Sequence, residues 1–166
     1  MKSLLSVILA LLIVSGAAMA GDKSSPKGLK WLSFEEAKVA AAKQKKTILL
    51  DVYTDWCKWC KKMDADTYGN PKVMEYLGKK FIIAKLNPEE DGNVIFKGKS
   101  ITKAEFAQNA GVNGYPTLLF FDAKGELITG ISSYLEAKQF LNIAQFIGDG
   151  KYEKMSWDEY SKTLKD

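Results

Sequence analysis

The chain contains neither histidine nor arginine, and all 24 of its basic residues are lysine. The absence of histidine excludes Ser-His-Asp and Cys-His catalysis, histidine general bases and His-containing metal sites. The absence of arginine removes the guanidinium forks that usually read phosphates and bases. The formal net charge is only +4. The composition therefore argues against nucleic acid as a partner.

Cysteine is also scarce, because the chain has only two, in the run Cys57-Lys58-Trp59-Cys60. An exported protein whose fold is stabilised by disulfides would contain more cysteines at wider spacing. A bridge that closes four residues would stabilise the fold by only roughly 2 kcal/mol. A chemically reactive pair explains the two cysteines better than a structural one.

A metal-binding role for the pair is the weaker interpretation. Two thiolates can hold a soft ion such as Cu(I), but a structural zinc site needs four ligands. Haem attachment needs a histidine directly after the second cysteine, and this position is Lys61. The sequence therefore predicts no metal and no other cofactor.

The N-terminus has the pattern of a secretory signal. Lys2 is followed by an apolar stretch at 4–14 and by the small residues Ala18-Met19-Ala20, which predict cleavage after Ala20. The apolar stretch has about half of the roughly 20 residues that a spanning helix needs, so an uncleaved membrane anchor is the weaker alternative. The expected location is periplasmic or otherwise exported. Residues 21–30 are polar, contain glycine and proline, and predict a flexible leader.

The rest of the chain is predicted to form one compact α/β domain with a mixed sheet covered by helices on both faces. Four N-capping patterns support the helices, and Ser33, Thr102, Ser133 and Ser156 each begin one of them. The stretch at 88–100 is predicted to be a polar loop. Strands are predicted at 47–54, 81–86, 117–122 and 126–131, and helices at 33–45, 57–63, 70–77, 102–110, 133–147 and from 156 onward.

The predicted turn from strand to helix explains how the cysteines would react. Cys57 stands at the helix N-terminus, where unpaired N–H groups and the helix dipole favour a thiolate. Lys58 adds positive charge beside it. Cys60 lies three residues further on the same face, so it can attack a mixed disulfide formed at Cys57. We expect Cys57 to be the nucleophile and Cys60 the resolving thiol.

The run TILLDVYTDWCKWCKK resembles the active-site strand and helix of the thioredoxin superfamily. The similarity continues in AKLNPE around Lys85 and in GYPTLLFFD around Pro116. It covers residues 31–148 and implies a thioredoxin fold, with 149–166 as an additional C-terminal helical extension. The chain looks like exported thioredoxin-like proteins and like the C-terminal domain of the transmembrane disulfide reductase.

The resemblance implies roles for two charged residues. Asp51, six residues before Cys57, matches the buried aspartate that exchanges a proton with the resolving thiol. Lys85 matches the lysine beside that carboxylate. Burial raises the pKa of a carboxyl group, which suits it to act as a general base for Cys60. A carboxylate bonded to a turn and a solvent-facing lysine are the alternatives.

The resemblance also implies a substrate-binding loop. Tyr115-Pro116 matches the family's cis-proline, where the backbone of the residue before the proline pairs with the bound substrate. Trp56 matches a tryptophan that shields the disulfide. An ordinary trans proline and a tryptophan packed in the core are the alternatives.

The resemblance implies a reductase of protein disulfides, which outside the cytoplasm would need a membrane thiol electron donor. The dipeptide Lys58-Trp59 departs from the Gly-Pro of thioredoxins, so a disulfide oxidant or isomerase is the alternative. A non-catalytic module that holds partners on the same fold is a further one. The interval from Lys85 to Pro116 is longer than in a minimal thioredoxin, and the extra residues fall at 91–100. They predict either a partner-specific loop or a tolerated surface insertion.

Overall fold

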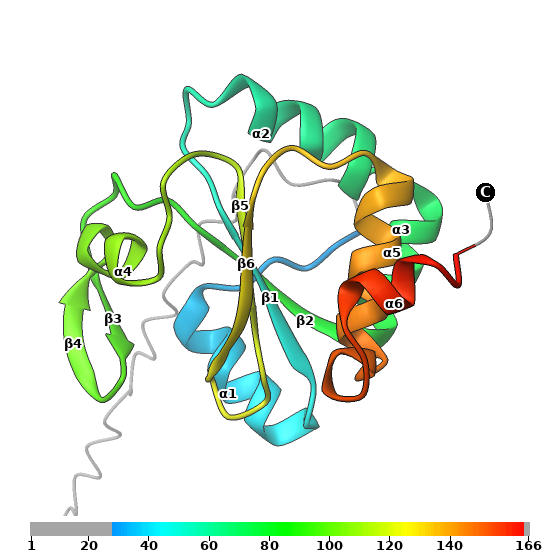
Figure 1. The fold of residues 1–166 in the computed structure, drawn as a ribbon. Helices are drawn as coiled ribbons and strands as arrows, with labels where there is room; N and C mark the ends of the chain where they lie inside the picture. The colour runs from blue at the N-terminus through cyan, green and yellow to red at the C-terminus, as the bar shows by residue number, and fades with distance from the viewer. Residues whose placement is uncertain (1–27, 165–166) are drawn as a thin grey trace, which may run out of the picture.

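The computed structural model describes residues 28–164 (Figure 1). The predicted signal at 1–20 and most of the predicted leader at 21–30 lie outside the described residues. At the centre is a four-stranded sheet in the order β2-β1-β5-β6. β1 and β2 are parallel, whereas β5 is antiparallel to both of its neighbours, so the predicted mixed sheet is confirmed. The strands are β1 (Thr47–Val52), β2 (Phe81–Leu86), β5 (Thr117–Phe121) and β6 (Leu127–Ser132).

The two central strands, β1 and β5, are mostly apolar because both faces of the sheet are covered. Every residue of β5 is buried, as are all residues of β1 after Thr47. The single charged residue of β1 is Asp51, which is paired in register with Lys85 of β2. The parallel register thus brings these two side chains next to each other inside the protein.

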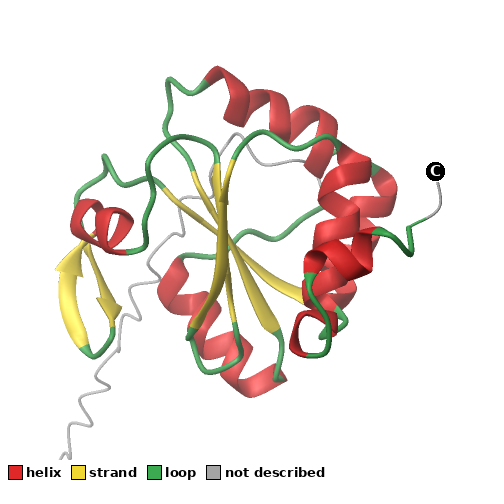
Figure 2. Ribbon diagram, in the orientation of Figure 1, coloured by secondary structure: helices red, strands yellow, loops and turns green. Residues whose placement is uncertain are grey.

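Helices cover both faces of the sheet (Figure 2). α1 and α4 pack against one face, and α3 and α5 pack against the other, each through its own hydrophobic cluster. Within residues 28–164, no helix is both long and apolar enough to span a membrane. The helices are α1 (Phe34–Gln44), α2 (Lys58–Met63), α3 (Pro71–Lys80), α4 (Lys103–Asn109), α5 (Ala137–Gly148) and α6 (Trp157–Ser161), and a π-helical turn, Asp64–Tyr68, follows α2.

Three of the four predicted capping boxes are confirmed, at Ser33, Thr102 and Ser156. The fourth is wrong, because α5 begins only after Glu136, whose side chain makes no cap. The backbone before Glu136 is used elsewhere: the carbonyl of Leu135 accepts a hydrogen bond of 2.6 Å from the Thr67 hydroxyl. This tertiary contact holds the segment outside the helix.

The prediction of a polar loop at 88–100 is also wrong, because a β-hairpin begins inside this segment, at Asn93. Val94 and Phe96 point into the core, and Phe96 packs edge-on against a ring of α4 at 5.1 Å. The turn consists of Lys97 and Gly98, both with positive φ, which is typical of tight hairpins. The strands of the hairpin are β3 (Asn93–Phe96) and β4 (Lys99–Thr102).

The segment after α5 packs against that helix. Phe146 of α5 contacts the rings of Trp157 and Tyr160 at 5.4 and 5.1 Å. Asp149 accepts a hydrogen bond from the Tyr76 hydroxyl (3.0 Å) and pairs with Lys80 at 2.8 Å. These contacts fasten the start of the C-terminal segment to α3, on the far side of the sheet from α1.

Candidate active site around a disulfide

Cys57 lies between β1 and α2 and is the N-cap residue of the helix. Its backbone is extended (φ −69°, ψ 104°), and its Sγ accepts a hydrogen bond of 3.0 Å from the backbone N–H of Cys60. An amide that points at the sulfur stabilises a negative charge on it. The local structure therefore favours a thiolate at Cys57 whenever the disulfide is open.

Cys57 and Cys60 form a disulfide. The residues are only 4 % and 3 % exposed, so a reacting sulfur from another molecule has to approach closely against the surrounding side chains. Those side chains therefore help to decide which disulfides can react. Within the described residues, no cluster of three or more Cys, His, Asp or Glu side chains could hold a metal ion.

Asp51 and Lys85 lie side by side on the neighbouring strands β1 and β2. Lys85 Nζ is 3.7 Å from Asp51 Oδ2, and the Lys85 side chain is only 5 % exposed. A solvent-facing lysine, the alternative interpretation of this residue, does not fit this position. The structure brings the two residues together as the resemblance implies.

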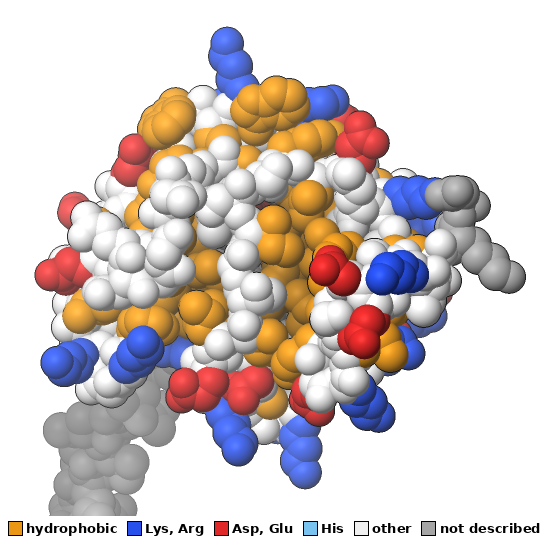
Figure 3. Space-filling model, in the orientation of Figure 1, with side chains coloured by type: hydrophobic (Ala, Val, Ile, Leu, Met, Phe, Trp, Pro, Cys, Tyr) orange, Lys and Arg blue, Asp and Glu red, His pale blue; other side chains and the backbone are white. Residues whose placement is uncertain are grey.

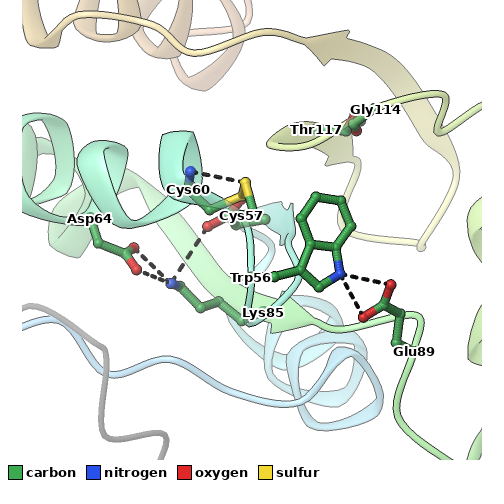
Figure 4. Close-up of a disulfide and its surroundings, with 9 residues drawn as sticks. Trp56, Cys57, Cys60, Asp64, Lys85, Glu89, Gly114 and Thr117 are labelled. Atoms are coloured by element: carbon green, nitrogen blue, oxygen red, sulfur yellow. Dashed lines mark hydrogen bonds and ion pairs between the residues drawn. A yellow bond between two sulfur atoms is a disulfide. The ribbon is translucent and has the colours of Figure 1, made fainter.

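Asp64 joins this pair, and the sequence interpretation missed it. Both of its carboxylate oxygens accept hydrogen bonds from Lys85 Nζ, at 2.6 and 2.8 Å. Asp64 stands four residues after Cys60, so the i+4 spacing could have indicated a common helix face. Figure 4 shows Asp64 and Lys85 on one side of the cysteine pair.

Two aromatic rings lie close to the ammonium group of Lys85. Its Nζ lies 5.1 Å from the ring centroid of Trp31 and 4.9 Å from that of Tyr53. Cation–π attraction adds to the ion pairs, since the ammonium is shielded from water. The charge of Lys85 is therefore stabilised on several sides within a buried site.

Tyr68 packs beside the two carboxylates. Burial raises the pKa of Tyr68 well above its ordinary value, and the negative charges of Asp51 and Asp64 raise it further. The phenol consequently stays neutral throughout the physiological range. The charged groups at this place are therefore the carboxyl groups of Asp51 and Asp64 and the ammonium of Lys85.

The Tyr115–Pro116 peptide bond is cis. Hydrogen bonds on both sides of the proline hold the loop in place. The Thr117 hydroxyl bonds to the carbonyl of Gly114 and to the Ser132 hydroxyl, both at 2.7 Å. The Tyr115 ring in turn faces the residue before Cys57. The structure therefore places this loop against the start of α2.

Trp56 is the side chain that Tyr115 contacts, with ring centroids 5.9 Å apart. It is 63 % exposed, so the alternative of plain core packing does not fit. Its indole N–H lies 3.0 Å from both carboxylate oxygens of Glu89, which the sequence interpretation also missed (Figure 4). Burial raises the pKa of the Tyr115 phenol, and the negative charge of Glu89 raises this pKa further. Trp56 is thus an exposed ring held in a fixed position.

A family model described as a thioredoxin-like domain matches residues 34–148. The thiol:disulfide interchange protein DsbD of Actinobacillus pleuropneumoniae serotype 5b is 33% identical over 103 residues, which cover 61% of this chain and 16% of that protein. DsbD of Photorhabdus laumondii subsp. laumondii is 29% identical over 112 residues, covering 66% of this chain and 18% of that protein. The chain therefore spans about one sixth of the length of these relatives.

Solved structures resemble the fold over most of its length. A thioredoxin-fold protein from Helicobacter pylori has a TM-score of 0.61 and 27% sequence identity, covering 86% of this chain and 89% of that one. The reduced C-terminal domain of DsbD from Neisseria meningitidis has a TM-score of 0.52 and 21% identity, covering 67% of this chain and 90% of that one. The fold class that the sequence predicts is confirmed.

Proposed function

Because the chain belongs to the family of thioredoxin-like domains, we propose that it is a thiol–disulfide oxidoreductase that exchanges its Cys57–Cys60 pair with disulfides of other proteins. The arrangement of the pair is the observation that carries this proposal. Cys57 caps the start of α2, and the backbone N–H of Cys60 points at its sulfur. This arrangement favours a reactive thiolate at one sulfur and places a second sulfur within reach of it.

The exchange proceeds in two displacement steps. The Cys57 thiolate attacks one sulfur of the substrate disulfide, so a mixed disulfide forms and the other substrate sulfur leaves as a thiolate. Cys60 then loses its proton and attacks Cys57 Sγ. The Cys57–Cys60 disulfide forms, and the substrate leaves with both of its sulfurs reduced. Two electrons pass from the protein to the substrate.

The buried cluster supports the second step. Asp51 takes the proton from Cys60, because a carboxylate held in a low-dielectric site is a stronger base than one in water. Lys85 balances the charge of Asp51 and is itself positioned by two hydrogen bonds to Asp64. The lysine thus keeps the carboxylate in place without exposing it to solvent.

The loop at Tyr115 and Pro116 positions the substrate. The backbone of Tyr115 pairs with the substrate chain in a short β-augmentation. Trp56 lies between this loop and Cys57 and shields the disulfide, supported by its contacts to Tyr115 and Glu89. Substrates are therefore protein segments that can adopt an extended conformation beside Cys57.

The direction of electron flow is that of a reductase, because the Asp51–Lys85 pair resembles that of thioredoxin and the transmembrane reductase. We expect the reduction potential to lie nearer to the thioredoxin value of about −270 mV than to the value of about −120 mV of a strong oxidant. Equilibration with defined ratios of reduced and oxidised dithiothreitol, followed by thiol alkylation and mass measurement, gives this value. A potential near the oxidising end would overturn the reductase and favour an oxidant or isomerase.

The protein is exported and draws its electrons from a membrane thiol donor. The pattern of residues 1–20 supports export. When the full chain is expressed in a Gram-negative bacterium, we expect the protein recovered from the periplasmic fraction to begin at Gly21. Intact-mass measurement checks this. A chain that keeps Met1 and sediments with the membranes would instead indicate an uncleaved anchor.

A further inference from the structure

A second tryptophan is exposed next to the disulfide. Trp59 stands between the two cysteines and is 56 % exposed. Its ring lies 5.2 Å from the ring of Tyr134, which belongs to the segment between β6 and α5. Figure 1 shows this segment at the end of the sheet that α2 covers, and Figure 3 shows hydrophobic side chains exposed at the same end of the molecule.

The contact with Tyr134 is held firmly. The ammonium group of Lys62 lies 5.6 Å from the Tyr134 ring. The next residue, Leu135, accepts the hydrogen bond from Thr67 that keeps this segment outside α5. Trp59 therefore has a fixed support while about half of its surface remains free. A rigid, exposed aromatic ring is a favourable anchor for a partner, since little conformational entropy is lost on binding.

The position of Trp59 does not follow from the needs of the core. The hydrophobic clusters on the two faces of the sheet do not include it. It adjoins Cys60 directly and is two residues from Cys57, so any chain bonded to Cys57 through a mixed disulfide passes close to it. Trp59 is also not isolated, because Trp56 is exposed on the other side of Cys57, and exposed apolar side chains that gather at one place mark an interaction site.

We propose that Trp59, supported by Tyr134, is a specificity-determining residue that binds a large apolar side chain next to the reactive cysteine of the protein substrate. This inference rests on the proposed function. The ring contributes when the substrate sulfur bonds to Cys57 Sγ, because the neighbouring side chain is then held against the indole. A disulfide without such a side chain reacts at the same cysteine but gains nothing from Trp59.

The test compares three disulfides. Two are peptide disulfides that differ only in having phenylalanine or serine beside the cysteine, and the third is hydroxyethyl disulfide, which has no side chain. The second-order rate constant of the reduced protein with each is measured by acid quench and chromatography. We expect Trp59→Ala to lower the rate constant with the phenylalanine peptide about tenfold. The rate constants with the other two disulfides should change less than about twofold.

Several variants make the result specific. Trp157→Ala removes another exposed tryptophan, on α6 (38 % exposed), and should leave all three rates unchanged. Tyr134→Ala should reduce the preference for phenylalanine partly, because Trp59 loses its support. Trp59→Phe should keep most of the preference. The readout is the ratio of the phenylalanine rate to the serine rate, because a change in the reduction potential of the cysteine pair affects both peptides alike.

Other results would overturn the inference. An equal loss for all three disulfides would mean that Trp59 acts on the cysteine pair itself and not on the substrate. Unchanged rates in Trp59→Ala would mean that it touches no substrate. If the wild-type protein reacts with none of the disulfides, the proposed function fails as well, whereas reaction without any preference for phenylalanine removes this inference alone.

Discussion

The substitution Cys57→Ser should lower the rate of protein disulfide reduction by about 10³-fold or more, because it removes the thiol that attacks the substrate disulfide. A serine hydroxyl is protonated at neutral pH, and the amide that points at Cys57 Sγ cannot make it a comparable nucleophile. Reduction of insulin by dithiothreitol, catalysed by the protein and followed by precipitation of the freed chain, measures this loss.

Cys60→Ser serves as the matched control, since it removes the other sulfur from the same helix. Here the first step remains and the second cannot occur, so the protein should stop as a mixed disulfide at Cys57. Non-reducing electrophoresis and mass spectrometry should show adducts that disappear on reduction. Such adducts with Cys60→Ser and none with Cys57→Ser would identify the nucleophile.

A non-catalytic binding module would behave differently. It would hold its partners through the surface around Tyr115 and Trp56, and neither cysteine would matter. If Cys57→Ser left the function of the protein in the cell intact, or if the wild type reduced no disulfide, the enzymatic proposal would be wrong. The two cysteine variants therefore separate an enzyme from a binding module in one experiment.

The sequence predicts those features that depend on residues close together in the chain. β2 has its predicted limits, 81–86, because its mostly apolar run stands between the lysines that end α3 and the dipeptide Asn87-Pro88. The capping boxes at Ser33, Thr102 and Ser156 close locally through contacts over three residues. In each case the pattern and the stabilising contact lie in the same few residues.

The features that were missed depend on distant partners. The β3–β4 hairpin is stabilised by Phe96 against α4, and the run around it is polar enough to look like a loop. The box at Ser133 fails because Thr67 binds the carbonyl of Leu135, 68 residues away in the chain. Asp64 acquires its place only when β2 brings Lys85 beside it. For Asp64 and the box at Ser133, the neighbouring residues contain no information about these contacts, whereas Lys97-Gly98 is a local signal for the hairpin.

The buried ion cluster gives the largest expected change in stability. Lys85→Met removes the cation that Asp51 and Asp64 share and leaves two carboxylates without it in a buried site. Removing one partner of a buried ion pair costs about 3–5 kcal/mol, so we expect the free energy of unfolding of the oxidised protein to fall by about that amount. Denaturation with urea at neutral pH measures the change.

Two further variants show whether charge is the cause. Lys85→Met combined with Asp64→Asn should recover part of the loss, because one of the two buried negative charges is removed. Lys79→Met breaks an exposed lysine–glutamate pair on α3 and should leave the stability unchanged within error. If Lys85→Met were no more harmful than Lys79→Met, the cluster would not hold the charges described above.

The same variant tests the role of the cluster in the exchange. Without Lys85 the carboxyl of Asp51 has lost the charge that balances and positions it, so transfer of the Cys60 proton should be impaired. The first step depends on Cys57 and the amide of Cys60, which Lys85 does not contact. We therefore expect Lys85→Met to accumulate the mixed disulfide while forming it at nearly the wild-type rate, whereas a merely structural lysine would slow both steps or neither.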